Sequence, residues 1–280
     1  MILIADSGST KTSWCLLNST SDVQHFTTAG INPYHTGQEE IIVLLQQEFQ
    51  ILKDKVSEIY FYGAGCTVEK SPLVKEALNR YFGTDLIEVN SDLLGAARSL
   101  CHSSEGIICI LGTGSNSCYY DGKSIVKNVP SLGFILGDEG SGSELGKMLL
   151  SDILKNQLPE VLIYEFHKTY VLSAAEAIEN VYRRPYPNRY LAGFVPFIAS
   201  HIESIEMKKL VQKSFSGFIQ RNVLQYEKAK ELPIHFTGSI AYHFKKELEE
   251  VLESFGLKLG RISKEPMDGL ISYYKEEKQL

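Results

Sequence analysis

The 280-residue sequence lacks several features that define common classes of protein. No apolar run approaches the roughly 18 residues that a membrane-spanning helix needs. The chain also has no block of basic residues: 28 lysines and arginines face 34 aspartates and glutamates, which gives a formal net charge of −6. Binding to nucleic acid or to an anionic membrane depends on concentrated positive charge, so we expect neither partner.

Cysteine is scarce, and its spacing excludes further classes. The five cysteines are far apart and none forms a C-x-x-C pair, which argues against zinc ribbons and ferredoxin-type clusters. Several lie inside apolar runs and are therefore expected to be buried thiols in a reducing compartment. The apolar start of the chain stops at Asp6 and has no basic residues before it, unlike a signal peptide. These observations predict a cytoplasmic protein.

The remaining composition is that of an ordinary globular protein. Hydrophobic residues make up 44% of the chain and charged residues 22%, whereas a disordered chain would be poorer in large apolar side chains. At roughly 150 residues per domain, the length predicts about two domains.

The pattern of apolar residues predicts an α/β fold in two similar halves. Three short strands (2–5, 13–17 and 23–28) are followed by alternating helices and strands up to residue 111, which predicts a mixed sheet with hairpins first and helical crossovers later. A weaker version of the plan follows, with a long helical region broken by prolines. We therefore predict domains at 1–111 and 112–266, with a C-terminal helix at 267–280 that packs back on the first domain. Ligands commonly sit in a cleft between two such halves.

The first glycine-rich turn, Asp6-Ser-Gly-Ser-Thr-Lys-Thr12, joins one predicted strand to the next. Small residues let backbone N–H groups approach an anion closely, and hydroxyl and ammonium groups add donors. It is not a P-loop, because Thr10 precedes Lys11 and a strand follows instead of a helix. The turn predicts a phosphate-binding hairpin, and a plain β-turn is the alternative.

Two later turns have the same character. Gly112-Thr-Gly-Ser-Asn116 follows a strongly apolar strand and leads into another strand, so it fails the Rossmann fingerprint. Phe236-Thr-Gly-Ser-Ile240 joins a short strand to a helix, and a helix N-terminus opened by Gly-Ser can hold part of a nucleotide. The turns at 6–12 and 112–116 each lie near the start of one half, so together they could bind the phosphates of one nucleotide.

Two carboxylates lie at positions suited to chemistry. Asp92 follows a predicted strand, at the end where ligands gather in α/β sheets, so it could act as a general base toward a hydroxyl. It could equally be the N-cap of the helix that follows. Asp138 lies in Gly133-Phe-Ile-Leu-Gly-Asp-Glu-Gly-Ser-Gly142, just before a helix. Helix capping is the simple explanation, but so many glycines around one carboxylate exceed what a cap requires.

Taken in order, these motifs resemble those of the N-acetylglucosamine kinases, a branch of the BadF/BadG/BcrA/BcrD-type ATPase family in the actin, hexokinase and Hsp70 superfamily. The resemblance spans essentially the whole chain. It implies two ribonuclease-H-like (actin-like ATPase) domains, each a mixed sheet flanked by helices, with an interdomain cleft. It also implies an ATP-dependent kinase that phosphorylates the 6-hydroxyl of an N-acetylated amino sugar, with N-acetylglucosamine as the expected substrate.

The resemblance further implies roles for individual residues. Asp92 would take the proton from the sugar hydroxyl, and Asp6 would position Mg²⁺, through water. The residues that would bind ATP and its phosphates are Gly8, Ser9, Thr10, Lys11, Gly112, Thr113, Gly238 and Ser239. The residues that would bind sugar hydroxyls are Asn32, Ser115, Asn116 and Asp138. Relatives also lead us to expect a homodimer.

Some features keep other functions open. Many relatives carry tryptophan where this chain has Leu132, so the N-acetyl pocket differs and an N-acetylmuramic acid kinase of cell-wall recycling is an alternative. A second alternative is a BadF-type ATPase that activates a partner enzyme through an iron–sulfur cluster, which needs clustered thiolates. Cys109 and Cys118 lie outside the glycine-rich loops, which disfavours it. A third is a sugar-sensing regulator, but no DNA-binding segment precedes Ile2.

Overall fold

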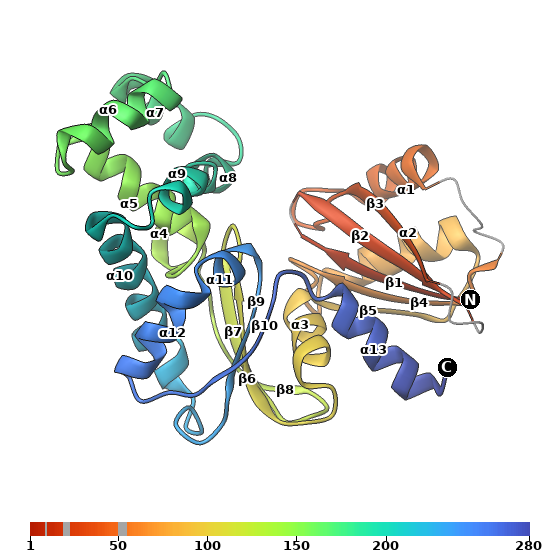
Figure 1. The fold of residues 1–280 in the computed structure, drawn as a ribbon. Coiled ribbons are helices and arrows are strands. Elements are labelled where there is room, and N and C mark those ends of the chain that lie inside the picture. Colours follow the sequence, from red (N-terminus) through yellow and green to blue (C-terminus); the bar gives the residue numbers. More distant parts are fainter. Residues whose placement is uncertain (9, 19–22, 50–54) are drawn as a thin grey trace. The chain divides into compact units, whose positions relative to one another are not determined.

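The computed structural model describes residues 1–8, 10–18, 23–49 and 55–280 of the chain. Two five-stranded mixed sheets, each flanked by helices, form the framework (Figure 1). Their contacts group the chain into two compact units. Unit 1 consists of Met1–Ser104, Asp121–Ile125 and Glu265–Leu280, and unit 2 of Glu105–Tyr120 and Val126–Lys264. The predicted α/β class with two mixed sheets is confirmed.

The sheet of unit 1 has the strand order β3-β2-β1-β4-β5. The strands β1 to β3 pair antiparallel, whereas β4 and β5 join them in parallel, as the change from hairpins to helical crossovers predicts. Their bounds are β1 Ile2–Ser7, β2 Lys11–Leu17, β3 Val23–Ala29, β4 Glu58–Gly63 and β5 Ile87–Ser91.

Helices cover both faces of this sheet. Trp14 and Phe61 lie in the core that includes apolar side chains of α1 and α2, while Ile4 and Tyr62 face the other core, with α3 and α13. Alternate residues of a strand point to opposite faces, so one sheet serves two cores. The helices are α1 Gln38–Glu48, α2 Ser71–Phe82, α3 Asp92–Cys101 and α13 Met267–Lys278.

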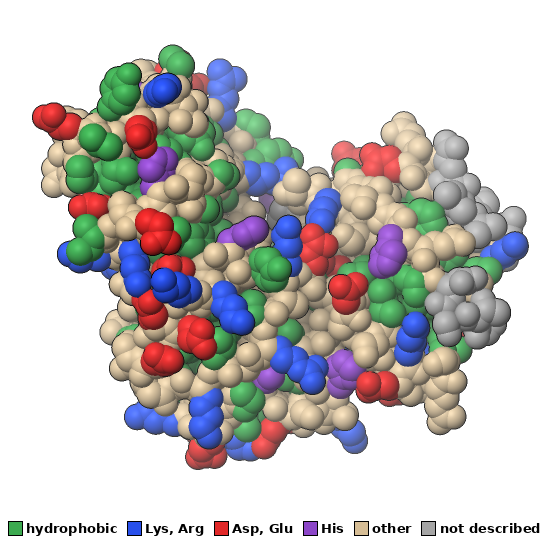
Figure 2. Space-filling model, in the orientation of Figure 1, with side chains coloured by type: hydrophobic (Ala, Val, Ile, Leu, Met, Phe, Trp, Pro, Cys, Tyr) green, Lys and Arg blue, Asp and Glu red, His purple; other side chains and the backbone are tan. Residues whose placement is uncertain are grey.

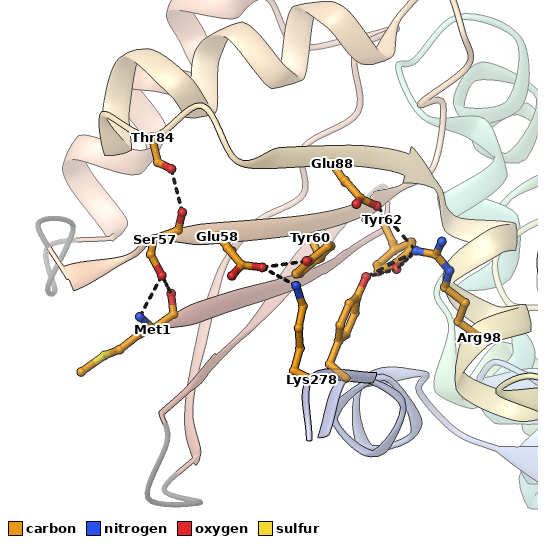
Figure 3. Close-up of polar contacts among 10 residues, drawn as sticks. Met1, Ser57, Glu58, Tyr60, Tyr62, Thr84, Glu88, Arg98 and Lys278 are labelled. Carbon is orange, nitrogen blue, oxygen red and sulfur yellow. Dashed lines mark hydrogen bonds and ion pairs between the residues drawn. The ribbon is translucent and has the colours of Figure 1, made fainter. Parts of the chain in front are cut away.

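The C-terminal helix α13 is held on unit 1 by polar and aromatic contacts (Figure 3). Tyr274 stacks on Tyr60 with ring centroids 4.1 Å apart, and its hydroxyl lies 2.5 Å from that of Tyr62. Arg98 of α3 donates a 2.7 Å hydrogen bond to the Tyr62 hydroxyl. At the far end, Lys278 forms a 2.6 Å ion pair with Glu58. The last helix therefore completes the core that the first strand begins.

The sheet of unit 2 repeats the plan, with the order β10-β9-β6-β7-β8. A hairpin between β6 and β7 comes first, and β9 and β10 are added in parallel. The repeat predicted from the sequence is therefore present. The bounds are β6 Gly106–Leu111, β7 Ser115–Tyr120, β8 Ile125–Val129, β9 Ile234–Thr237 and β10 Leu259–Ser263.

The helical region of unit 2 is divided where the prolines predict. Pro159 is the N-cap of α6, and Pro187 and Pro196 lie in the first turns of α8 and α9, where proline costs no internal hydrogen bond. A short helix, α4, was not predicted. The bounds are α4 Gly133–Leu136, α5 Gly142–Leu154, α6 Glu160–Thr169, α7 Ala174–Tyr182, α8 Pro187–Ala192, α9 Val195–Ser200, α10 Ile205–Arg221, the 3₁₀ helix Val223–Gln225, α11 Ser239–His243 and α12 Lys245–Ser254.

The compact units differ from the predicted domains at β6 and at the segment Asp121–Ile125, which belongs to unit 1. The sequence analysis ends the first domain at residue 111, but β6 pairs with β7 and β9 in the second sheet, so unit 2 begins at Glu105. Periodicity locates a strand along the chain but does not identify its neighbours in the sheet. The helix α13 belongs to unit 1.

All five cysteines are buried and none forms a disulfide, as the apolar sequence around several of them predicts. Burial raises the pKa of the Cys15 and Cys66 thiols to about 12. Among the described residues, no helix is both long and apolar enough to cross a bilayer.

A buried histidine makes the stability of unit 2 sensitive to acid. His235 on β9 is 8% exposed, and its Nδ1 accepts a 3.0 Å hydrogen bond from the backbone N–H of Arg261. Burial, and secondarily the charge of Arg261, lowers the pKa of His235 to about 4. An unfolded chain protonates this histidine near pH 6.5. Folding therefore excludes a proton between these two values.

We predict that His235 lowers the free energy of unfolding by at most about 3 kcal/mol as the pH drops from about 6.5 to 4, while the raised pKa of Asp6 acts in the opposite direction over the same range. Glutamine at position 235 can still accept the Arg261 hydrogen bond but does not titrate, so the free energy of unfolding of His235→Gln should fall less, or rise more, than that of the wild type over this range. Urea unfolding measured at several pH values tests this. An equal slope in His235→Gln and wild type would contradict the prediction.

Candidate functional site

The ends of three parallel strands bring the predicted residues of unit 1 together. Ser7 pairs with Gly63, and Gly63 pairs with Ser91, so β1, β4 and β5 end at the same level. Neighbouring strands lie about 4.8 Å apart, which puts the ends of β1 and β5 about 10 Å from each other. Asp6 lies at one of these ends and Asp92 follows the other. The sheet therefore places two carboxylates at one edge.

The predicted phosphate hairpin leads from β1 into β2 and is braced from within. The Ser7 and Thr12 hydroxyls lie 2.7 Å apart, and both accept hydrogen bonds from the backbone N–H of Ile31. The Gly8 N–H donates to the Lys11 carbonyl across the turn, at 3.0 Å. Gly8, Thr10 and Lys11 are exposed. The side-chain donors of Thr10 and Lys11 can therefore reach a ligand, while the buried hydroxyls hold the turn. Ser9, also predicted to bind phosphate, lies outside the described residues.

Asp92 is the first residue of α3, and the capping role falls to its neighbour. The Ser91 hydroxyl accepts from the Leu94 N–H at 3.3 Å, which makes Ser91 the N-cap. One oxygen of Asp92 accepts from the Leu93 N–H at 2.9 Å. The carboxylate is half-buried, and burial raises its pKa. The helix start thus leaves a basic carboxylate at the sheet edge.

Negative charge is concentrated around Asp6. Its pKa is raised to about 7, first by burial and then by Asp92 and Glu265, against the opposing effect of Lys11. Glu265 pairs with Lys11 at 2.7 Å. Sequence analysis missed Glu265 because it comes 254 residues after its partner and lies in no motif.

Asn32 lies near the same edge, directly after the buried Ile31. Its side-chain oxygen accepts a 3.0 Å hydrogen bond from the Tyr34 N–H. A Cβ on Gly65, which has a φ of +80°, would lie 2.5 Å from that oxygen. The Asn32 side chain is therefore fixed by its own loop and by the turn after β4, while remaining half-buried.

The equivalent edge of unit 2 collects the other glycine-rich turns. Ile110 pairs with Thr237, and Thr237 with Ser263, so the loops after β6 and β9 start side by side. Gly238 has a φ of +113°, and a Cβ there would lie 2.3 Å from the Leu111 carbonyl oxygen. Only glycine permits this approach. It brings the start of α11 against the Gly112 turn.

The N-terminus of α5 is hydrogen-bonded to the Gly112 turn. The Gly142 N–H donates to the Gly112 carbonyl at 2.8 Å, and the Ser143 N–H donates to the Thr113 carbonyl at 3.0 Å. These bonds satisfy two of the donors that every helix start leaves free. They also orient the turn, because its carbonyls face α5.

A cavity of about 470 Å³ opens beside these turns, within the range typical of small-molecule sites. Gly112, Thr113 and Ser239, all predicted to bind nucleotide, line one side of it. The residues that complete the lining, which sequence analysis missed, are Gly142, Ala192, Val195, Pro196, Ala199, Ile240 and His243. Val195 and Ala199 lie four residues apart on one side of a helix, and this spacing is the sequence pattern from which the wall could have been predicted.

Asp138 and Ser115, which the sequence analysis expects to bind sugar hydroxyls, lie together in unit 2. The Ser115 N–H donates to Asp138 Oδ1 at 3.1 Å, and burial raises the pKa of Asp138. Asp138 has a φ of +58°, a conformation that is unfavourable for residues other than glycine. Two groups hold the loop in place: the adjacent Gly140 N–H donates to Glu144 at 2.7 Å and to Ser214 at 3.1 Å.

Asn116 is tied into the sheet. Its side-chain oxygen accepts from the Ser117 N–H and from the Asn128 side chain, both at 2.9 Å. Any bond from a ligand to this oxygen would compete with these two. Among the unit 2 residues predicted to bind sugar, Asn116 is therefore less available to a ligand than Ser115 and Asp138.

The carboxylates of unit 1 suit a magnesium ion that is held partly by other ligands. Among the described residues, no three histidine, cysteine, aspartate or glutamate side chains are close enough to bind a metal by themselves. Mg²⁺ is commonly held by one or two carboxylates together with water and substrate phosphates. Asp6, with its raised pKa and excess nearby negative charge, fits that role.

A family model and a similar protein of known structure indicate what this chain is related to. The model of the BadF/BadG/BcrA/BcrD ATPase family matches residues 5–268. A protein of known structure from Porphyromonas gingivalis, described as a candidate N-acetylglucosamine kinase, is 49% identical. The match covers 99% of this chain and all of that one, with a TM-score of 0.96. No protein with curated function matches the sequence.

Two more distant structures share the fold. One, from Chromobacterium violaceum and also titled as a candidate N-acetylglucosamine kinase, is 17% identical over 97% of this chain and 98% of that one, with a TM-score of 0.76. The other is a ROK family glucokinase from Streptomyces griseus, solved with glucose and AMPPNP; it is 12% identical over 100% and 99% of the two chains, with a TM-score of 0.56. The expected two-domain actin-like ATPase fold is thereby confirmed.

Proposed function

The chain belongs to the BadF/BadG/BcrA/BcrD ATPase family, and we propose that it is an ATP-dependent kinase that phosphorylates the 6-hydroxyl of an N-acetylated amino sugar. The observation that carries the proposal is the position of Asp92: a half-buried carboxylate with a raised pKa, at the same sheet edge as the phosphate-type hairpin. A general base needs a pKa near the working pH, and burial moves Asp92 in that direction.

In the proposed reaction, Asp92 accepts the proton of the sugar hydroxyl. The sugar oxygen forms a bond to the γ-phosphorus, and the bond from that phosphorus to the β-bridging oxygen breaks, which leaves ADP. Such a transfer depends mainly on positioning and on neutralising charge. In unit 1, the Thr10 and Lys11 side chains would bind phosphate oxygens, and Gly8, whose N–H donates to the Lys11 carbonyl, would let the phosphate come close to the backbone. Lys11 is already paired with Glu265 and would exchange that carboxylate for phosphate.

Magnesium, when bound with the nucleotide, would neutralise charge on the phosphate oxygens. Asp6 would hold it through water. The ATPase family and the glucokinase solved with AMPPNP support ATP as the cofactor, whereas magnesium rests on the charge around Asp6. A location in the cytoplasm belongs to this proposal as well.

Unit 2 would bind the nucleotide in the 470 Å³ cavity. Thr113 and the Gly238–Ser239 turn would contact phosphate and ribose, while Val195 and Ala199 offer an apolar wall for the base. Small-molecule sites generally combine such a wall with a few polar groups that fix orientation.

The segment before Asp138 supports an acylated sugar as the acceptor. Leu132, Ile135 and Leu136 are 59%, 75% and 69% exposed, although large apolar side chains are seldom left so open together. The methyl group of an N-acetyl substituent, or the lactyl group of N-acetylmuramic acid, would cover part of this surface. We propose N-acetylglucosamine as the acceptor and keep N-acetylmuramic acid as the alternative. The buried cysteines favour a kinase over an activator that presents thiolates to a cluster.

The proposed function is tested by measuring ADP release with a panel of acceptors: N-acetylglucosamine, N-acetylmuramic acid, N-acetylmannosamine, glucosamine and glucose. We expect release to depend on an N-acetylated sugar, with at least about tenfold lower kcat/KM for glucose, because glucose leaves the apolar segment uncovered. Release that no acceptor stimulates would contradict the proposal and favour an activator or a sensor.

Replacing the proposed base tests the mechanism. Asp92→Asn keeps the size of the side chain and its acceptor for the Leu93 N–H but cannot take a proton, so kcat should fall by a factor of about 10²–10⁴ while ATP binding is retained. The measurements are coupled turnover and calorimetric titration with ATP. Asp268→Asn, an exposed aspartate in the first turn of α13, is the matched control and should keep wild-type turnover. Substantial turnover in Asp92→Asn would remove Asp92 from this role.

The cavity of unit 2 provides a separate test of nucleotide binding. Ala199 lines it from an exposed position on α9, so Ala199→Phe should fill the space without disturbing the core. We expect the KM for ATP to rise about tenfold or more and the KM for the sugar to stay nearly constant. Ala199→Ser, which adds little volume, is the control. An unchanged KM for ATP in the phenylalanine variant would place the nucleotide elsewhere.

A further inference from the structure

His243 is the last residue of α11, and it lines the cavity of unit 2. Ser239, at the start of the same helix, lines that cavity as well. Residues four positions apart lie on one face of a helix, and a rise of 1.5 Å per residue separates these two by about 6 Å along it. Ser239 belongs to the turn proposed to contact phosphate and ribose. His243 therefore lies one helical turn beyond that end of the nucleotide.

The wall that α9 contributes to the cavity is apolar. Val195, Pro196 and Ala199 line it, and Pro196 has no backbone N–H that could donate to a base. Val195 and Ala199 are also one helical turn apart, so they form one face of α9. A planar base can lie flat against such a face.

His243 is the polar side chain of this lining that the proposed function leaves unassigned. Among the described residues that line the cavity, the side chains with hydrogen-bonding groups are Thr113, Ser239 and His243. The first two lie in the turns proposed to hold phosphate and ribose. The imidazole ring is thus left for the base.

The ring of His243 is in contact with that of its neighbour in the sequence. The ring centroids of Tyr242 and His243 are 5.6 Å apart, and the two planes are nearly perpendicular, at 89°. In such a pair the edge of one ring points at the face of the other, so at least one face of the imidazole is free of Tyr242. Both side chains are exposed. A flat ring is therefore available on the α11 side of the cavity.

We propose that His243 stacks on the base of the nucleotide, which lies between this ring and the α9 wall, and that the kinase therefore accepts other purine nucleoside triphosphates besides ATP. The inference rests on the nucleotide site proposed above. Every base has a π-face, so stacking does not distinguish one base from another. Strong discrimination comes from hydrogen bonds to the edge of one base, because the wrong base then leaves polar groups unpaired.

The chemistry of the transfer is the same with another donor. The sugar oxygen forms a bond to the γ-phosphorus of GTP, the bond from that phosphorus to the β-bridging oxygen breaks, and GDP leaves. The proton of the sugar hydroxyl passes to Asp92, as proposed for ATP. The base takes no part in these steps, so the choice of donor depends on binding alone.

Calorimetric titration in buffer containing Mg²⁺, without sugar, tests the stacking contact apart from catalysis. The wild-type Kd values for ATP, GTP and ITP should lie within about a factor of one hundred of each other. His243→Ala should raise all three by about tenfold or more, because it removes the ring on which the base stacks. His243→Phe keeps an aromatic ring and should restore values near those of the wild type. Tripolyphosphate has no base, so its Kd should be equal in the three proteins.

A second exposed histidine of unit 2 provides a matched control. Histidine side chains are visible on the surface of this unit in Figure 2. His167 on α6 is exposed, and its ring lies 5.7 Å from that of Phe166 and nearly perpendicular to it, much as His243 lies beside Tyr242. His167 is outside the lining of the cavity. His167→Ala should therefore keep the wild-type Kd for every ligand.

The outcomes separate this inference from the proposed function. A rise in Kd for ATP alone in His243→Ala, or a wild-type preference for ATP over GTP of more than about a hundredfold, would overturn the inference and leave the proposed kinase in place. A phenylalanine variant as weak as the alanine variant would also overturn it, because the contact would then be a hydrogen bond. A wild-type chain that binds none of the three triphosphates would overturn the proposed function and this inference with it.

Discussion

The parallel pairing of β1, β4 and β5 is the constraint on which the candidate active site depends. Because Ser7, Gly63 and Ser91 share one register, the loops after these strands begin at one edge. The same pairing in unit 2 aligns the turns after β6 and β9. A shift of one residue in the register of β1 would turn Asp6 from one face of its sheet to the other. The chemistry of the site is thus set by hydrogen bonds between backbones.

Glycines allow the helices behind the candidate site to pack closely, because a glycine lets two elements approach each other more closely than a side chain would. A Cβ on Gly95 of α3 would lie 2.8 Å from the Tyr62 side chain, and one on Gly146 of α5 would lie 1.8 Å from the Leu191 carbonyl oxygen. Each helix that follows a functional loop is therefore seated directly on its neighbour. Asp92 and the Gly142 turn lie at the starts of these two helices, so their positions follow from the packing behind them.

Much of the fold could be predicted from the sequence, because its signals are local. The change from alternating to helical periodicity located the hairpins and crossovers, and prolines divided the helical region of unit 2. The glycine-rich turns identified Gly112 and Gly238 before any neighbour was known. The details that sequence analysis missed depend on partners far along the chain: the membership of β6 in the second sheet, and the pairing of Glu265 with Lys11.

The candidate site shows the same division. Asp92 was open to two interpretations, and only the position of Ser91 as the N-cap separates them. The wall of the unit 2 cavity was missed because Val195 and Ala199 have the pattern of ordinary apolar residues of a short helix. Asp138 was predicted from its glycine neighbours, but its left-handed backbone conformation is imposed by bonds to the loop, which no local pattern encodes.

The return of α13 to unit 1 has a consequence for biosynthesis. Residues Met267, Leu270 and Tyr274 complete the core around Ile2 and Ile4, although some 260 residues of chain separate them. All of unit 2 is synthesised before this last helix emerges from the ribosome. Domains commonly fold in the order of their synthesis, yet the first strand of this chain keeps one apolar face open until α13 has been synthesised. The N-terminal unit is therefore the later of the two to mature, and its earliest strands are the ones a chaperone would have to shield.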